Sequence, residues 1–156
     1  DPFACGGQCL HLWDLINIGI TSDKRYMKRT INNKKRFNQP LLFEGLENGT
    51  ICYTDIDFIL EIDNHTLIIG ECKTKGNPLT RGQELLIKRL CDKEWKNAIG
   101  IVVEHDIPSD QDIMLKDTIV RKFYMNSQWK DIRDTKTPYN KFIKVLTNKW
   151  EVKKLT

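Results

Sequence analysis

Acidic residues and a lysine interrupt an otherwise apolar stretch, "TDIDFILEIDNHTLIIGECKTKG", at residues 54–76. Charged groups are costly to bury in a sheet, so these side chains suggest a chemical role. Side chains alternate along a strand, which places Glu71 and Lys73 on one face of the strand that they end. If Asp57 lies near the end of the partner strand of a hairpin, its carboxylate converges on the same point.

Two carboxylates that close repel each other, and in a half-buried site both stay ionised only with a cation between them. Oxygen ligands of this kind favour Mg²⁺, with Mn²⁺ as a substitute. Asp57 and Glu71 are the expected ligands, and the backbone carbonyl of Cys72 is a natural third. Lys73 can orient or help deprotonate a metal-bound water, or stabilise charge on a phosphate, as phosphodiester hydrolysis requires. A Glu-x-Lys triplet alone also occurs as an exposed cross-strand pair.

The flanking sequence predicts a hairpin and a helix that position these residues. Residues 50–62 are rich in β-branched and aromatic side chains, "DNHT" supplies turn residues, and residues 67–75 resume the apolar run. This pattern predicts an antiparallel hairpin. Apolar residues then recur four positions apart in "LTRGQELLIKRLCDKEW", which predicts a helix.

Further elements are expected on both sides of this unit. Residues 97–106 form a continuous apolar run, which predicts a buried strand beside the hairpin. Residues 118–130 predict an edge strand and turn, and residues 139–150 predict a closing helix with Phe142, Leu146 and Trp150 on one stripe. The sequence of residues 10–36 weakly predicts helix. This order of helices and strands along the chain predicts an α/β sandwich with a mixed central sheet flanked by helices.

Asp57, followed after a hairpin-sized gap by Glu71-Cys72-Lys73, resembles the core motif of the PD-(D/E)XK nuclease superfamily. The segment "GTICYTDIDFILEIDNHTLIIGECKTKGNPLTRGQELLIKRL" is similar to small phage and bacterial nuclease-like proteins, and the resemblance covers about residues 43–105. It implies a restriction-endonuclease-like fold, with Asp57 and Glu71 as metal ligands and Lys73 as the catalytic lysine. The usual proline before the aspartate is missing, because Tyr53 and Thr54 stand there.

Three further acidic or amide residues are candidates for the site. Asp55 competes with Asp57 as a ligand; we prefer Asp57 because in the superfamily the apolar strand directly follows the ligand aspartate. Some members place a glutamine on the following helix, near the attacking water or a phosphate, which implies a catalytic role for Gln83. Thr80 and Gln83 also match a capping box, and the two roles are compatible. Glu44 stands where many members carry an additional acid, although it also suits a solvated turn.

Basic residues concentrate near the N-terminus, although the whole chain carries a net charge of only +4. Such clustering suits a polyanion, although a solvated helix face gives the same pattern. The expected DNA-binding residues are Lys24, Arg25, Lys28, Arg29, Lys34, Lys35, Arg36 and Lys75. A homodimer is expected if the substrate is a two-fold symmetrical junction or a duplex cut on both strands.

The chain of 156 residues is long enough for one globular domain. We expect a helical, basic extension at residues 1–36 and a nuclease-like domain at residues 37–156. Met27 would make a credible translation start, so the first 26 residues are interpreted as an accessory extension. No run of apolar residues approaches the ~20 needed to span a membrane, and no secretory leader is evident, so a cytoplasmic location is expected, in the host if a phage encodes the protein.

Other motifs are weaker. Cys5, Cys9 and His11 could supply three zinc ligands, but a fourth is not evident. Glu104-His105 follows a predicted strand near the site, although a lone histidine is more often structural. Trp95, Trp129 and Trp150 favour core or edge packing over base stacking. The sequence therefore predicts a Mg²⁺-dependent deoxyribonuclease, endonuclease or exonuclease, with a non-catalytic nucleic-acid-binding, accessory or inhibitor protein of the same fold as the alternative.

Overall fold

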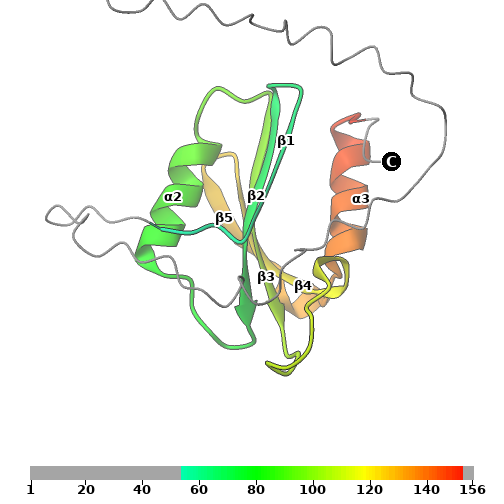
Figure 1. Cartoon of the computed structure of the whole chain (residues 1–156). Helices are drawn as coiled ribbons and strands as arrows, with labels where there is room; N and C mark the ends of the chain where they lie inside the picture. The colour runs from blue at the N-terminus through cyan, green and yellow to red at the C-terminus, as the bar shows by residue number, and fades with distance from the viewer. Residues whose placement is uncertain (1–53, 153–156) are drawn as a thin grey trace, which may run out of the picture. The chain divides into compact units, whose positions relative to one another are not determined.

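The computed structural model describes residues 54–152 (Figure 1). Within this part of the chain, five strands form one sheet in the order β1-β2-β3-β4-β5. The elements are β1 (Phe58–Ile62), β2 (Thr66–Thr74), α2 (Arg81–Cys91), β3 (Asn97–His105), the 3₁₀ turn η2 (Leu115–Asp117), β4 (Ile119–Met125), β5 (Gln128–Asp131), the 3₁₀ turn η3 (Arg133–Thr135) and α3 (Tyr139–Lys149).

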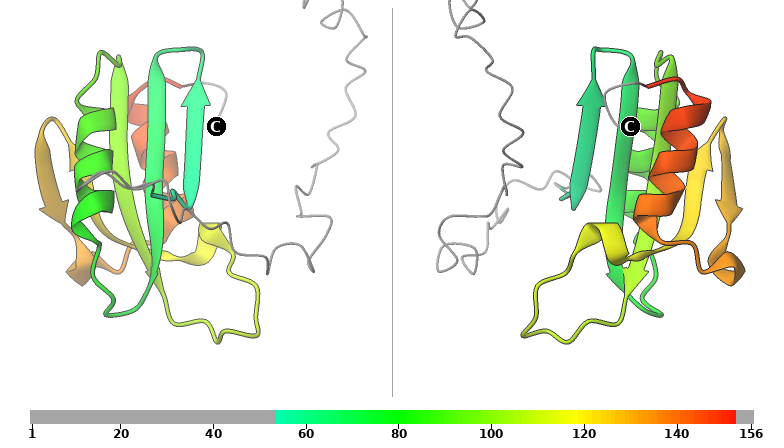
Figure 2. Two further views of the ribbon diagram at one scale, coloured as in Figure 1. Left: turned by 60° about the vertical axis from the view of Figure 1, so that its left-hand side comes forward. Right: turned by 90° about the vertical axis from the view of Figure 1, so that its right-hand side faces the viewer.

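The sheet is mixed, as the sequence predicts. The strands β2 and β3 run parallel, and the other neighbouring pairs are antiparallel. A parallel pair needs a crossover connection, which α2 provides between β2 and β3. Helices α2 and α3 cover opposite faces of the sheet (Figures 1 and 2). The α/β class is therefore confirmed.

The hairpin of β1 and β2 turns where "DNHT" predicts it. Asp63 and Asn64 have φ angles of 52° and 58°, in the left-handed region that these side chains tolerate. The His65 amide donates a hydrogen bond to the Ile62 carbonyl at 3.2 Å. The turn therefore fixes which residues of the two strands face each other.

The first strand is shorter than the sequence predicts. It begins at Phe58, residues 54–57 are not in a strand, and residues 50–53 lie outside the described part. Oδ2 of Asp57 accepts a hydrogen bond from the Cys72 amide at 2.7 Å. A longer β1 would use its own backbone to satisfy this amide of β2, so the aspartate side chain replaces the backbone partner and the ladder ends there.

Helix α2 lies against the face of the sheet that carries Glu71. Its N-terminus has the predicted capping box between Thr80 and Gln83. Ile87 packs on Gly100 of β3 so closely that a Cβ at Gly100 would lie 2.0 Å from the Ile87 side chain. The helix therefore approaches the sheet closely enough for its first turn to reach the end of β2.

The main core lies between the sheet and α3. Its fully or nearly buried members are Ile68, Ile99, Ile101, Val103, Val120 and Leu146, and Phe142 and Trp150 pack against them. The apolar stripe predicted for residues 139–150 is thereby confirmed. Among the described helices, none is long and apolar enough to cross a membrane.

One prediction about the sheet is wrong. The sequence suggests that residues 118–130 provide an edge strand, but β4 lies between β3 and β5, and β5 forms the edge. The chain reverses at Asn126 and Ser127, which both have left-handed φ angles. Tyr124 on β4 and Trp129 on β5 then pack against each other across these two strands, with ring centroids 5.3 Å apart. Aromatic cross-strand contacts stabilise such pairs, so the short β5 is retained beside β4.

Candidate active site

Asp57 and Glu71 lie across from each other at one end of the hairpin. Phe58 pairs with Gly70 in the antiparallel register; Asp57 directly precedes Phe58 at the start of β1, and Glu71 directly follows Gly70 on β2. Phe58, Gly70 and Cys72 face α3, so alternation directs Asp57 and Glu71 toward α2. The register therefore places Asp57 and Glu71 at the same end of the hairpin. Asp57 is exposed, whereas Glu71 is only 2% exposed.

Glu71 is held by two neighbours through a single oxygen. Oε2 lies 3.0 Å from Nζ of Lys73 and accepts a hydrogen bond of 2.7 Å from Nε2 of Gln83. Neither contact uses Oε1. Among the contacts of residues 54–152, the buried carboxylate is thus fixed in orientation through Oε2, which leaves Oε1 for a further ligand.

The environment of Glu71 opposes its ionisation. Burial raises the pKa of its carboxyl above the usual 4.5, the hydrogen bond from Lys73 lowers it in part, and the negative charges of Asp57 and Asp55 raise it further. The net shift is upward, so the lysine alone does not offset the burial. A cation beside Oε1 would favour the charged form, which is the electrostatic requirement of a metal ligand.

Lys73 follows Glu71 on the same face of β2, as predicted. Its side chain is 18% exposed, so the ammonium group lies between the buried carboxylate and the solvent. A cation in this position can contact a substrate phosphate while it remains paired with Glu71. This placement differs from an exposed cross-strand pair, since one partner is buried and hydrogen-bonded on a second side.

Gln83 takes part in two interactions at once. Its Oε1 accepts a hydrogen bond from the Thr80 amide at 3.3 Å, and its own amide donates to Oγ1 of Thr80 at 3.3 Å; these two bonds form the capping box. Its Nε2 donates to Glu71. Gln83 is 7% exposed. The side chain therefore links the start of α2 to the carboxylate, and the two roles predicted for it coexist.

The donor set suits a hard, well-hydrated cation. Among the described residues, no cluster of three or more histidine, cysteine, aspartate or glutamate side chains could hold a metal ion. Mg²⁺ commonly uses one or two carboxylates and keeps several waters, so Asp57 and Glu71 could hold such an ion without a third acid. Asp55 is exposed and close enough to affect the pKa of Glu71, so it remains a competitor.

The Cys72 backbone is placed to add an oxygen ligand. Lys75 donates its amide to His105 of β3 at 2.7 Å, so backbone groups at odd positions in this part of β2 point to β3. The amide and carbonyl of Cys72 therefore point away from β3, to the side of β2 on which β1 lies. They lie past the point at which β1 begins. Its amide binds Asp57, and its carbonyl faces the same edge as that carboxylate.

Several predicted site residues lie outside the described residues. These are Glu44, the basic cluster Lys24, Arg25, Lys28, Arg29, Lys34, Lys35 and Arg36, and the three candidate zinc ligands. The expected extension 1–36 also lies outside. Lys75 is described: it is exposed, just after β2, on the strand face shared by Glu71 and Lys73.

The remaining candidates have structural contacts. Nδ1 of His105 accepts the Ile107 amide at 3.1 Å, which is a turn contact. Nε1 of Trp95 donates to the Leu90 carbonyl at 3.0 Å, and Trp150 packs against the core. The preference for packing over base stacking agrees with these positions.

Sequence reasoning missed Arg121. Its Nη1 donates to the Asn77 carbonyl in the β2–α2 loop at 2.7 Å, across 44 residues of sequence. The loop carries Thr80 and leads into the turn that holds Gln83. No local pattern marks this arginine, because it acts only through the pairing of β4 with β3.

Comparisons of the chain with protein-family models, curated proteins and solved structures find no match.

Proposed function

We propose that this protein is a Mg²⁺-dependent nuclease that hydrolyses phosphodiester bonds in DNA. The observation that carries the proposal is the meeting of Asp57, Glu71 and Lys73 at one end of a hairpin, with Glu71 buried yet paired with the lysine. The hairpin, the following helix and the parallel strand support a restriction-endonuclease-like core.

Each residue of the candidate site has a proposed role that follows from its position. Asp57 and Glu71 would bind the metal ion, with the Cys72 carbonyl beside them. Mg²⁺ bound there would supply Lewis acidity toward the phosphate and an activated water. Lys73 offers a partly exposed ammonium to the reacting phosphate and stabilises the charge that develops on it. Gln83 keeps Glu71 in one orientation through its hydrogen bond to Oε2.

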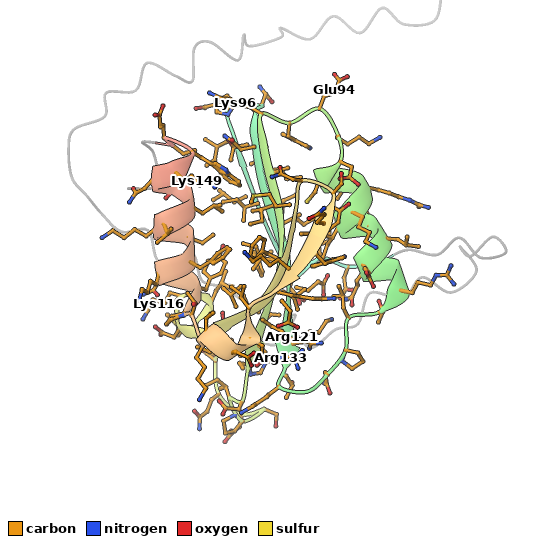
Figure 3. The ribbon with its side chains drawn as sticks, turned by 180° about the vertical axis from the view of Figure 1, so that it is seen from behind. Glu94, Lys96, Lys116, Arg121, Arg133 and Lys149 are labelled. Carbon is orange, nitrogen blue, oxygen red and sulfur yellow. The ribbon has the colours of Figure 1, made fainter. Side chains whose placement is uncertain are left out.

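The direct test compares cleavage and binding in one pair of variants. Lys73→Ala is expected to abolish cleavage of plasmid, linear, branched and single-stranded DNA with Mg²⁺ or Mn²⁺, and to leave DNA binding largely intact. Lys96→Ala is the matched control, because this exposed lysine lies at the opposite end of the sheet from the β2–α2 loop (Figure 3). Equal cleavage by wild type and Lys73→Ala would contradict the proposal.

A binding protein of the same fold is the alternative. The hydrogen bonds of Asp57 to Cys72 and of Gln83 to Glu71 also stabilise the end of the hairpin without any metal. Measurable DNA binding by wild type, with no cleavage of any of these substrates, would favour this alternative.

A further inference from the structure

A second basic feature lies beside the candidate active site. A pocket of about 210 Å³ is lined by Lys75, Gly76, Glu104, Arg121 and Arg133. The lining of this pocket therefore includes three cationic residues and one acidic residue. Figure 3 shows Arg121 and Arg133 next to each other near the end of the sheet from which the β2–α2 loop leaves.

The three cations come from different parts of the chain. Lys75 follows β2, Arg121 lies on β4, and Arg133 begins η3. On β4, Val120 and Lys122 pair with Val103 and Val102, so Arg121 is the extra residue of a β-bulge. Bulges redirect side chains, which explains how this arginine reaches a pocket shared with the β2–α2 loop.

The arginines retain capacity for a ligand. Nη1 of Arg121 donates to Asn77, whereas its Nε is buried and, among the described residues, has no hydrogen-bond partner. A buried donor without a partner is costly, and an acceptor oxygen would satisfy it. Arg133 pairs with Asp131 at 3.4 Å, with both side chains more than half exposed, so this weak pair leaves the guanidinium able to turn.

The pocket adjoins the reacting centre. Lys73 and Glu104 are partners in the parallel register, and Glu104 lines the pocket. Lys75 lies two residues beyond Lys73, or about 7 Å along an extended chain. Neighbouring phosphates of one nucleic-acid strand have a similar spacing. A phosphate in the pocket and a phosphate beside Lys73 can therefore belong to one substrate strand.

We infer that Lys75, Arg121 and Arg133 bind a phosphate group of the substrate strand next to the phosphate that reacts. Arginine suits this ligand because its donors match phosphate oxygens in pairs. Glu104 repels an anion on its own side of the pocket. A bound phosphate should therefore lie against the three cationic side chains. The inference rests on the proposed function for its substrate, but its test measures binding and does not require cleavage.

The experiment measures the affinity of the full chain for a labelled oligonucleotide over a series of salt concentrations. The double variant Arg121→Ala/Arg133→Ala is expected to bind about tenfold or more weakly, with a salt slope about one to two units smaller, as expected for lost phosphate contacts. Lys96→Ala should leave both values nearly unchanged. Unchanged affinity and slope in the double variant would overturn the inference.

Two single variants test the inference even if the double variant misfolds. Arg133→Ala removes only a weak exposed pair, so it should stay folded and still lower the slope. Asp131→Ala frees Arg133 from its carboxylate, so binding should be equal or tighter; weaker binding would count against the pocket.

Oligonucleotides with a 5′-phosphate or a 5′-hydroxyl distinguish the source of the phosphate. An equal loss with both indicates an internal phosphodiester, and a loss only with the phosphorylated form indicates a terminal phosphate. Either supports a phosphate site. The readout also separates the two proposals. If the double variant loses binding while the wild type never cleaves DNA, the phosphate pocket is supported and the nuclease is rejected. If the wild type cleaves DNA and the double variant binds as tightly, the nuclease is kept and the phosphate pocket is rejected.

Discussion

Gln83 donates a hydrogen bond from Nε2 to Oε2 of Glu71 at 2.7 Å, while its Oε1 accepts from Thr80. One amide therefore joins the cap of α2 to the buried carboxylate at the end of β2. The orientation of Glu71 depends in this way on where the helix begins, and the capping box becomes part of the candidate site.

The two roles of Gln83 can be separated by variants. Thr80→Ala removes the cap and should lower the free energy of unfolding by about 1 kcal/mol, with cleavage largely retained. Gln83→Ala should lower stability and also raise the Mg²⁺ concentration for half-maximal cleavage, because Glu71 loses its orienting hydrogen bond. Denaturant unfolding and Mg²⁺ titrations of cleavage give the two values. If the Mg²⁺ requirement shifts equally in both variants, Gln83 acts only as a cap.

Asp57 and Asp55 are distinguished by isosteric substitution. Asp57→Asn keeps an oxygen that accepts the Cys72 amide, so the fold should be retained while the ligand charge is lost. We expect cleavage to fall by at least two orders of magnitude in Asp57→Asn and by much less in Asp55→Asn. Cleavage assays over a range of Mg²⁺ concentrations check this, with circular dichroism as a control for folding. The reverse order of effects would make Asp55 the main ligand.

Glu71 should destabilise the metal-free protein at neutral pH. Burial, more than the neighbouring aspartates, raises the pKa of its carboxyl above 4.5. Below about pH 4.5 the group is protonated in both the folded and unfolded states; as the pH rises toward the folded-state pKa, only the unfolded state ionises freely, so stability falls. Glu71→Gln removes this effect and should raise the free energy of unfolding at pH 7.

Urea unfolding of both proteins in EDTA, from pH 4 to pH 8, measures this difference. The advantage of Glu71→Gln should grow with pH from near zero, while cleavage by this variant in Mg²⁺ is lost. A variant less stable than wild type at pH 7 would show that the ion pair with Lys73 outweighs the burial.

The described cysteines should react slowly with alkylating reagents. Burial, followed by the charge of Asp92, raises the pKa of the Cys91 thiol to about 12, so about one thiol in ten thousand is thiolate at pH 8. Burial and the charge of Asp57 also raise the pKa of Cys72. Peptide-level mass spectrometry after iodoacetamide treatment should find both unmodified in the native protein and modified in urea. Rapid native labelling of Cys91 would contradict the raised pKa of its partly buried thiol.

The sequence by itself determines the local frame of the site. Alternation along residues 67–75 places Glu71 and Lys73 on one face, and the Asp63-Asn64 turn fixes their register with Asp57. The helix after the hairpin and its capping box follow from apolar spacing and from Thr80 and Gln83. These features depend on contacts between residues close in sequence, so periodicity and turn chemistry are enough to predict them.

Only the tertiary structure decides which distant groups meet. Asp57, just before β1, accepts the Cys72 amide in place of a further strand residue, and Gln83 contacts Glu71 because Ile87 packs closely on Gly100. Arg121 reaches the β2–α2 loop through a bulge in β4, and the pairing of β4 with β5 moves the sheet edge outward. Side-chain direction at a strand end and strand order depend on packing across the whole sheet, and no short pattern of residues encodes them.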